Sequence, residues 1–313
     1  MRRTFLRSKD AKALVVARNV LEMRTYRQGV IFKNPRATVG FVPTMGFLHE
    51  GHLSLFREAR KNNDFVAASI FVNPSQFAAH EDFDVYPSNI ERDLQYLKDE
   101  GVDVVFMPDS KEMYSGTHAT WVVPDSDGNL AEGSSRPGFF RGVATVVTKL
   151  FNIVQPTTSY FGQKDAQQAM VIQTMVDDLD MPLRVEVCPT VRESDGLAMS
   201  SRNANLCKDG RRIAPVVYRG LREAEKYYAE KRVADSLAGG GGCGGQRTMP
   251  RSYLQEIIED VYQNEGGIEE VHYISIASKH NMEELDHIDL TRGAIISVAV
   301  QIGGVRLIDN LLL

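Results

Sequence analysis

Short hydrophobic runs alternate with helical patterns along the first two thirds of the chain. The runs lie at residues 37–43, 65–72, 102–107 and 159–162, and each has the length of a buried strand, about four to eight residues. Between them, apolar residues recur at helical spacing in segments 53–59, 90–97, 143–154 and 167–179. Strands that alternate with helices in this way predict βαβ units and an α/β fold with a doubly wound parallel sheet. Ligands of such sheets bind beyond the carboxyl ends of the strands.

The last third of the chain has a different pattern. Helical spacing covers residues 211–231 and 253–262, and strand-like runs follow at 272–277 and 294–301. We interpret this part as a smaller α+β domain, and we divide the chain into domains 1–194 and 195–313. Between the two helices, segment 239–245 contains six glycines in seven residues. Because no strand precedes it and no Gly-Lys-Ser/Thr follows it, a flexible surface insert is favoured over a phosphate-binding loop.

The N-terminus is strongly basic. Residues 1–40 contain ten Lys or Arg residues and two acidic residues, a bias that mitochondrial transit peptides share. The apolar residues Leu14, Val15, Leu21 and Met23 nevertheless continue the pattern up to the first strand, and they favour a first helix that covers the core. We therefore expect a helix and a cytoplasmic protein, with an organelle signal as the alternative.

Composition narrows the class of protein. Hydrophobic residues make up 43% of the 313 residues and charged residues 25%, as in ordinary globular proteins. A net charge of −5 disfavours a general nucleic-acid binder, which is typically basic. Three scattered cysteines, Cys188, Cys207 and Cys243, predict neither a disulfide framework nor a zinc site and fit a reducing compartment. No stretch approaches ~18 consecutive apolar residues, so no membrane span is expected.

The turn after the first strand carries two histidines in a His-x-Gly-His pattern. His49 and His52 flank Gly51 where the next helix begins. A helix N-terminus offers free N–H groups to a phosphate, and glycine allows close approach of a ligand to the backbone. The imidazoles can donate to oxygens where charge develops on a leaving pyrophosphate. A zinc pair or two capping histidines are the alternatives, although zinc proteases space their histidines at i, i+4.

A second motif follows about 150 residues later, within Asp195-Gly196-Leu197-Ala198-Met199-Ser200-Ser201-Arg202-Asn203. Hydroxyls beside an arginine suit a triphosphate. The pairing of His-x-Gly-His with Met-Ser-Ser-Arg resembles the signature motifs of adenylate-forming, Rossmann-like nucleotidylyl transferases.

Four further segments lie at the ends of predicted strands or just before predicted helices. They are Val42-Pro43-Thr44-Met45-Gly46, Ser69-Ile70-Phe71-Val72-Asn73-Pro74-Ser75-Gln76-Phe77, Ser134-Ser135-Arg136-Pro137-Gly138 and Phe161-Gly162-Gln163-Lys164-Asp165-Ala166-Gln167-Gln168. Together these motifs closely resemble the pantothenate synthetase (pantoate–β-alanine ligase) family, from about Ala11 to the C-terminus.

The resemblance implies an ATP-dependent ligase that forms a C–N bond between (R)-pantoate and β-alanine. ATP, a substrate that carries Mg²⁺, and pantoate first give pantoyl adenylate and pyrophosphate. The amine of β-alanine then attacks the acyl carbon and releases AMP and pantothenate, a step in coenzyme A biosynthesis. The resemblance also implies a homodimer whose partners are small molecules rather than nucleic acid or a membrane.

The resemblance also assigns the site. Catalytic roles fall to His49, His52, Lys164 and Arg202, with His52 in the family's proton-donor position and Asp165 near the ribose or adenine. The ATP-binding residues are Met45, Gly46, Phe47, Leu48, His49, Glu50, Gly51, His52, Gly162, Gln163, Lys164, Asp165, Val191, Met199, Ser200, Ser201 and Arg202. The substrate-binding residues are Gln76, Gln168, Asn73 and Arg136. Of these, Gln76 and Gln168 are predicted to hold pantoate, and Gln76 also lies near β-alanine. No residue is assigned to a metal.

Two further positions, Phe139 and Asp93, are considered for the site. Phe139 stands where the family often has histidine, so no polar role is expected there. Asp93 is interpreted either as a magnesium neighbour or as a solvated helix carboxylate.

One rival function is another adenylate-forming nucleotidylyl transferase of the same superfamily, or a small aminoacyl-tRNA synthetase. The C-terminal part, however, offers no surplus of basic residues for binding tRNA. The other is an inactive nucleotide-binding protein, which the intact His49, His52, Lys164 and Arg202 disfavour.

Overall fold

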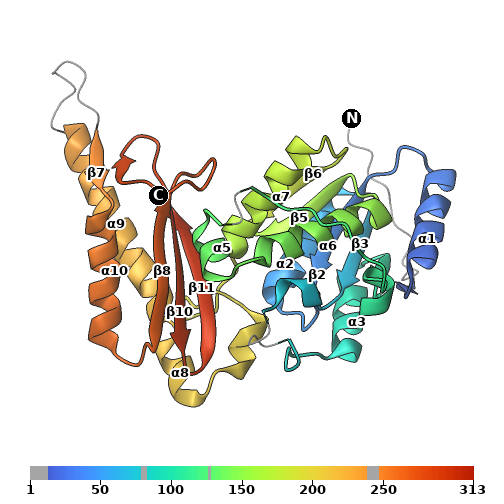
Figure 1. The fold of residues 1–313 in the computed structure, drawn as a ribbon, viewed down its shortest axis with the longest axis horizontal. Coiled ribbons are helices and arrows are strands. Elements are labelled where there is room, and N and C mark those ends of the chain that lie inside the picture. Colours follow the sequence, from blue (N-terminus) through green and yellow to red (C-terminus); the bar gives the residue numbers. More distant parts are fainter. Residues whose placement is uncertain (1–12, 79–82, 126–127, 238–246) are drawn as a thin grey trace.

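The computed structural model describes residues 13–78, 83–125, 128–237 and 247–313, and Figure 1 shows the arrangement of their helices and strands. The first twelve residues and the glycine-rich segment 239–245 lie outside the described residues. The organelle-signal alternative and the flexible insert therefore stay predictions. Within the described part, a parallel sheet and an antiparallel sheet organise two neighbouring units.

The larger sheet has six parallel strands in the order β1-β4-β3-β2-β5-β6. The strands are β1 (Val15–Ala17), β2 (Val39–Thr44), β3 (Phe65–Ile70), β4 (Val104–Phe106), β5 (Thr158–Gly162) and β6 (Arg184–Cys188). This sheet confirms the predicted doubly wound α/β fold. From β2 the chain builds β3 and β4 in one direction and then crosses to β5 and β6 on the other side. The strand order reverses between β2 and β5, which is where ligands of such sheets bind.

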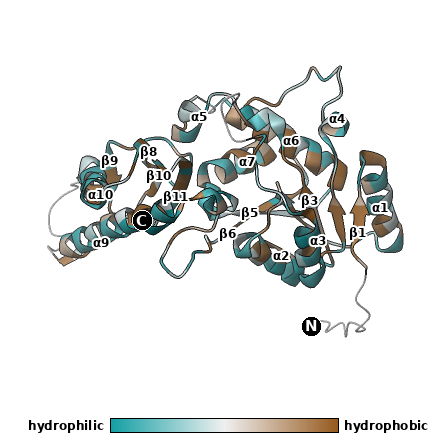
Figure 2. Cartoon of the chain, turned by 90° about the horizontal axis from the view of Figure 1, so that it is seen from below, coloured by the Kyte–Doolittle hydropathy of each residue, from teal (hydrophilic) through white to brown (hydrophobic). Residues whose placement is uncertain are grey.

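Helices cover both faces of this sheet because its central strands are apolar on both sides. In β2, Phe41 packs against the ring of Phe151 in α6, whereas its neighbour Val42 packs in the core formed with α2 and α3. One face is covered by α1 (Val20–Lys33), α6 (Phe139–Val154) and α7 (Ala166–Asp178), and the other by α2 (Glu50–Asn62) and α3 (Ile90–Asp99). Figure 2 shows the hydrophilic outer surfaces of α2 and α3 beside the hydrophobic strands.

Short elements form the connections around the carboxyl edge of the sheet. They are the helices α4 (Ser110–Met113) and α5 (Ala131–Ser135) and the 3-10 turns η1 (Pro74–Gln76), η2 (Gln163–Asp165) and η3 (Ser201–Asn205). Gly142 of α6 shows how closely one of these turns packs. A Cβ atom at Gly142 would lie 2.3 Å from the carbonyl oxygen of Ser75 in η1. Only glycine therefore allows α6 to approach η1 at this point.

The second unit is built on an antiparallel sheet with the strand order β11-β10-β8. Its elements are α8 (Lys208–Ile213), α9 (Val216–Leu237), β7 (Thr248–Pro250), α10 (Ser252–Glu265), β8 (Glu270–Ala277), β9 (His287–Asp289), β10 (Ile295–Ile302) and β11 (Val305–Leu312). Helices α9 and α10 share a core with the sheet through the fully buried Leu221, Ile258 and Val298. The edge strand β11 faces the parallel-sheet unit (Figure 1). The prediction that this part of the chain has an α+β fold is confirmed.

The start of the described chain differs from the expectation. The predicted first helix begins only at Val20, and Val15 instead lies in β1, where it pairs with Val104 of β4. Within the helix Met23 is buried as expected, whereas Leu21 is 75% exposed. The helical interpretation was therefore wrong for Leu14 and Val15, whereas Leu21 lies in the helix but does not cover the core as expected. A three-residue strand that relies on a partner about 90 positions away leaves too short a pattern to be distinguished from a helical turn.

The strands β6 and β11 were not predicted either. Charged residues interrupt the short apolar run of β6, and the adjacent polar residues Asp309 and Asn310 interrupt that of β11. The division of the chain at residue 194 stays a prediction. Arg192, just before it, already contacts Asp309 of β11. Among the described residues, no helix is both long and apolar enough to cross a membrane.

Candidate active site

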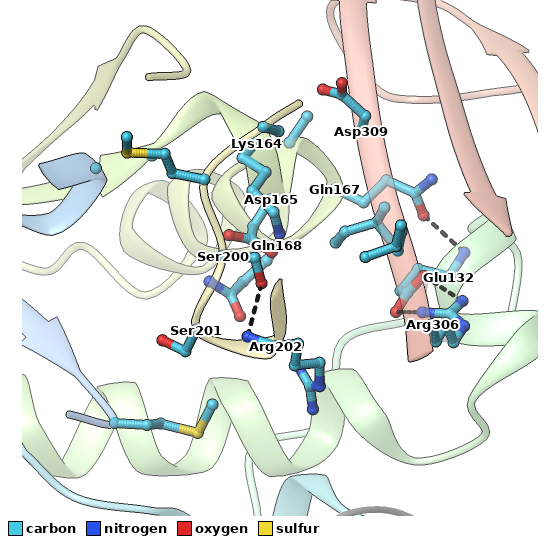
Figure 3. Close-up of a pocket in the computed structure, with 18 of the residues that line it drawn as sticks. Glu132, Lys164, Asp165, Gln167, Gln168, Ser200, Ser201, Arg202, Arg306 and Asp309 are labelled. Atoms are coloured by element: carbon cyan, nitrogen blue, oxygen red, sulfur yellow. Dashed lines mark hydrogen bonds and ion pairs between the residues drawn. The ribbon is translucent and has the colours of Figure 1, made fainter. Parts of the chain in front are cut away.

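The carboxyl ends of β2 and β5 open into a cavity of about 880 Å³ between the two units, shown in part in Figure 3. Most residues that the sequence predicted for the site line this cavity. They are Met45, His49, Gly51, His52, Asn73, Gln76, Arg136, Gly162, Lys164, Asp165, Gln168, Val191, Met199, Ser200, Ser201 and Arg202. Within the described part of the chain, Gly46, Phe47, Leu48, Glu50 and Gln163 are not among its lining residues. The structure therefore brings together residues that lie as much as 157 positions apart.

The turn between β2 and α2 has an unusual backbone. Gly46 and Phe47 both have positive φ angles, +85° and +50°. A Cβ atom at Gly46 would lie 3.0 Å from Ile70 and 3.2 Å from a carboxylate oxygen of Asp93. The backbone N–H groups of Phe47 and Leu48 donate to the two oxygens of that carboxylate, at 2.7 and 2.8 Å. These three residues thus shape the turn while their neighbours line the cavity.

Asp93 contacts the His-x-Gly-His turn, although the sequence interpretation did not include it in the site. It lies in α3 and is completely buried, so the solvated-carboxylate interpretation was wrong. Each of its oxygens accepts one N–H from the turn, and charged acceptors make such bonds strong. Asp93 therefore holds the backbone of the His-x-Gly-His turn. The sequence shows only that Asp93 lies in the acidic first turn of a helix capped by Asn89. It does not show which backbone N–H groups bind the carboxylate.

The two histidines lie close together at the start of α2. Their ring centroids are 4.0 Å apart, and the backbone N–H of His49 donates to Nδ1 of His52 at 3.4 Å. This bond leaves the proton of a neutral His52 on Nε2, where it can be donated to a ligand. Gly51 makes room for this pair, since a Cβ there would lie 2.9 Å from the His49 ring. Gly51 thus serves the packing of His49 in addition to the predicted close approach of a ligand.

Burial keeps both rings neutral. Burial, helped by the charge of Lys164, lowers the pKa of His49 to about 4. Burial and the neighbouring His49 lower the pKa of His52 well below its usual value. Both rings are therefore neutral at pH 7, and each carries one N–H that can be donated. Among the described residues there is no group of three or more His, Cys, Asp or Glu side chains arranged to hold a metal ion.

The second motif is fastened directly to the first. The N–H of Met199 donates to the carbonyl of Val191 at 3.0 Å, which closes a hairpin before the loop. The hydroxyl of Ser200 accepts the N–H of Arg202 at the start of η3, as Figure 3 shows. The hydroxyl of Ser201 donates to the carbonyl of Phe47 at 3.1 Å. One hydrogen bond therefore joins loops that are 154 positions apart in the chain.

Lys164 lies in the turn after β5, with its ammonium 3.5 Å from Asp165. The last strand of the chain fixes this turn. The side-chain amide of Asn310 in β11 donates to the carbonyls of Gln163 and Lys164, at 2.8 Å each. Gln163 returns a bond to the Asn310 oxygen at 3.1 Å, so its side chain is directed at the second unit rather than at the cavity.

A third group of predicted residues lies at the end of β3. The amide nitrogen of Asn73, which is 1% exposed, donates to Oε1 of Gln76 at 2.9 Å. Arg136 donates to the carbonyl of Gln76 at 3.0 Å, and its guanidinium lies 3.9 Å from the ring centroid of Phe139. Phe139, for which no polar role was expected, thus supports the arginine. Gln168 lines the same cavity from α7.

Two buried ion pairs across the units were not predicted. Glu132 of α5 accepts from both terminal nitrogens of Arg306 in β11, at 2.9 and 2.8 Å (Figure 3). It also accepts from the hydroxyl of Tyr273 at 3.0 Å. Burial raises the pKa of Glu132, but the bonds and charge of Arg306 outweigh this and the pKa is lowered overall. Arg192 forms the second pair, with Asp309. No local pattern signals these pairs, because the partners lie 174 and 117 positions apart.

Glu50 differs most from its predicted role. Its carboxylate lies at the first position of α2 and forms a salt bridge with Arg57 on the surface, where the two side chains are 44% and 49% exposed. The acidic side chain is thus directed away from the cavity. Unlike Asp165, whose ion pair with Lys164 lies at the cavity, Glu50 forms its ion pair outside the cavity.

Comparison with known proteins gives consistent matches over almost the entire chain. A family model described as "Pantoate-beta-alanine ligase" matches residues 15–312. Pantothenate synthetase from Chloroflexus aggregans is 48% identical over 275 residues, which cover 88% of this chain and 93% of the relative. The protein of the same name from Chloroflexus aurantiacus (strain J-10-fl) is 49% identical over 286 residues, which cover 90% and 95%.

Solved structures give the same result. The crystal structure of pantothenate synthetase from Thermus thermophilus has a TM-score of 0.80 and 41% identity, covering 95% of this chain and 98% of that one. Pantoate-beta-alanine ligase from Francisella tularensis, complexed with beta-gamma ATP and beta-alanine, has a TM-score of 0.73 and 34% identity, covering 96% and 98%. The resemblance inferred from the motifs is confirmed.

Proposed function

The chain belongs to the pantoate-β-alanine ligase family, and on this premise we propose how its cavity carries out the reaction. The enzyme is a ligase that joins pantoate and β-alanine through an amide bond to give pantothenate, with ATP as a substrate. In the proposed first step, the carboxylate of pantoate attacks the α-phosphorus of MgATP, and the bond to the bridging oxygen of pyrophosphate breaks. In the second step, the amine of β-alanine attacks the acyl carbon and AMP leaves.

The triphosphate is proposed to lie across the joined His-x-Gly-His and Met-Ser-Ser-Arg loops. The observation that carries this proposal is the Ser201–Phe47 hydrogen bond, which holds the two loops against one cavity. The N-terminus of α2 favours negative charge there. Lys164 and Arg202 add positive charge, and neutral His52 donates from Nε2 to an oxygen on which charge grows. Such preorganised donors stabilise the transition state more than the ground state.

Pantoate is proposed to lie at the end of β3, against Gln76 and Gln168. The amide of Gln76 lies beside Met45, at 3.6 Å from its sulfur, and so next to the loop proposed for ATP. The guanidinium of Arg136 lies at the same end. It donates to Gln76, lies over Phe139 and pairs with Glu132 at 3.3 Å. This arrangement supports a pantoate carboxylate close to the α-phosphate, with β-alanine entering near Gln76. Binding both reactants in one cavity removes much of the entropic cost of their encounter.

The structure suggests a modified role for Asn73. Its amide is bound within the protein on both sides, so we propose that it supports Gln76 instead of binding substrate itself. We further propose that the enzyme is a cytoplasmic homodimer without a nucleic-acid or membrane partner, and that the domains divide at residue 194. These points rest on the family resemblance and on composition.

Phosphorus NMR of the complete reaction tests the proposal. With ATP, pantoate and β-alanine, we expect AMP and pyrophosphate to appear in equal amounts with pantothenate. Without β-alanine, a stoichiometric burst of pyrophosphate should appear while pantoyl adenylate stays bound. Accumulation of ADP and phosphate together with the amide would indicate an acyl phosphate and contradict the adenylate route. A nucleotide that remains in the product would instead indicate another nucleotidylyl transferase.

A further inference from the structure

The hydrogen bonds around Gln76 fix which end of its amide faces the cavity. Oε1 accepts from Nδ2 of Asn73 at 2.9 Å, and Nε2 lies on the side of Met45. An amide has one donor end and one acceptor end. As long as Asn73 presents a donor, Gln76 must turn its acceptor away from the cavity. Gln76 therefore offers N–H groups to a ligand.

Asn73 is itself fixed by two backbone groups that can act in only one way and by two hydroxyls. Its Nδ2 also lies 3.3 Å from the carbonyl of Gly142, which can only accept. Its Oδ1 lies within reach of the Ser75 backbone N–H at 3.4 Å and the Ser75 hydroxyl at 2.9 Å. The strongest-placed donor on this side is the hydroxyl of Tyr114, at 2.8 Å. Asn73 is almost completely buried, so water does not compete for these bonds.

Tyr114 is held rigidly on the side away from the cavity. Its ring stacks on Trp121, with centroids 6.1 Å apart and planes at 22°, and His118 packs edge-on at 5.0 Å. The ammonium of Lys149 lies 5.5 Å from the ring centroid. Burial raises the pKa of Tyr114, although the bond with Ser75 opposes this, so the hydroxyl keeps its proton. It can therefore donate to Asn73 while its oxygen accepts from the Ser75 hydroxyl, which lies 2.9 Å away.

We propose that Tyr114 is a positioning residue for pantoate, acting through Asn73 to hold the Gln76 amide with its N–H groups toward the substrate. The proposal rests on the proposed placement of pantoate against Gln76. Tyr114 does not line the cavity among the residues that the structure describes, and it does not touch the ATP loops. Its loss should therefore weaken pantoate binding selectively.

Steady-state kinetics of Tyr114→Phe test this proposal. Loss of one hydrogen bond to the Gln76 support should raise the pantoate KM about fivefold, the effect of one typical bond. The kcat and the ATP KM should stay within about twofold, because the ATP loops are untouched. Ser75→Ala, which removes the second hydroxyl on Asn73, should act in the same direction. The matched control is Tyr228→Phe, whose buried hydroxyl donates to Leu290 in the second unit.

A double-mutant cycle shows whether Tyr114 acts through Gln76. In a Gln76→Ala background, adding Tyr114→Phe should leave the pantoate KM unchanged, because the amide that it positions is gone. Additive effects would contradict the proposal, as would an unchanged pantoate KM in Tyr114→Phe or an equal rise in the ATP KM. Wild-type protein that forms no pantothenate would overturn the proposed function instead, so the two failures are distinguishable.

Discussion

The cavity has two walls of different origin. One wall consists of the His-x-Gly-His turn and the Met-Ser-Ser-Arg loop, in which neighbouring residues of a motif act together. The other consists of single residues on the last strand, β11, such as Arg306 and Asn310. The first wall presents neutral donors and positive charge to the space between the units. The second wall directs its side chains at partners in the protein, including Glu132 and the backbone of Lys164.

This difference separates chemistry from support. A substitution in the motif wall should change rates, because its groups face the charge that develops in the reaction. A substitution in the β11 wall should first change stability, because its groups are bound to the other unit. Four predictions test this separation, beginning with the largest expected effect.

His52→Ala should lower kcat for adenylate formation by about 10²–10³, the usual loss for one preorganised donor. Supplied with pre-made pantoyl adenylate, the variant should recover much of its rate with β-alanine, because that substrate bypasses the first step. Rapid-quench assays of both half-reactions measure this. His287→Ala, at an exposed position on β9, is the control. If the variant is slowed equally when it starts from pantoyl adenylate, His52 acts in amide formation or stabilises the fold instead.

Glu132→Gln should lower the free energy of unfolding by about 3 kcal/mol, because it leaves the buried side of Arg306 without its carboxylate. The Glu132 side chain is 7% exposed and that of Arg306 22%. Urea denaturation at pH 7 measures the change. Since the pKa of Glu132 is lowered in the folded protein, the stabilisation should fade as the pH falls below about 4.5, where wild type and variant should converge. If the free energy of unfolding changes by less than about 1 kcal/mol at pH 7, the ion pair between Glu132 and β11 does not stabilise the protein as expected.

The same contrast explains what the sequence could predict. The parallel fold, His49, His52, Lys164 and Arg202 follow from local patterns and from motifs whose order resembles a family. The roles of Asp93 and Glu132 could not be predicted, because each is an isolated carboxylate whose partner depends on the folded chain. Glu50 was placed in the site because it belongs to a motif, yet the direction of its side chain depends on the helix face. The motifs therefore predict which segments meet at the cavity, but they do not predict the direction of each side chain.

His49 should make stability depend on pH. Because its pKa is lowered to about 4, the folded protein binds fewer protons than the unfolded chain between about pH 4 and 6.5. The free energy of unfolding should therefore fall as the pH is lowered through this range. His49→Gln should remove on the order of 2 kcal/mol of the decline between pH 7 and pH 5. Urea midpoints at both pH values measure it, with His287→Gln as control. An identical decline in the wild type and in His49→Gln would contradict the burial of a neutral His49.

Glu50→Gln should have the smallest effect. Its carboxylate pairs with Arg57 on the surface, where both side chains are nearly half exposed, and exposed pairs contribute about 0–1 kcal/mol. The ATP KM should stay within about twofold of wild type, because the side chain is directed away from the cavity. Titrations of ATP at saturating pantoate and β-alanine measure the ATP KM. Because only the side chain changes, the backbone of the turn stays available to ATP in the variant. A large rise in the ATP KM would return Glu50 to the ATP site and would show that motif membership predicts orientation better than the fold indicates.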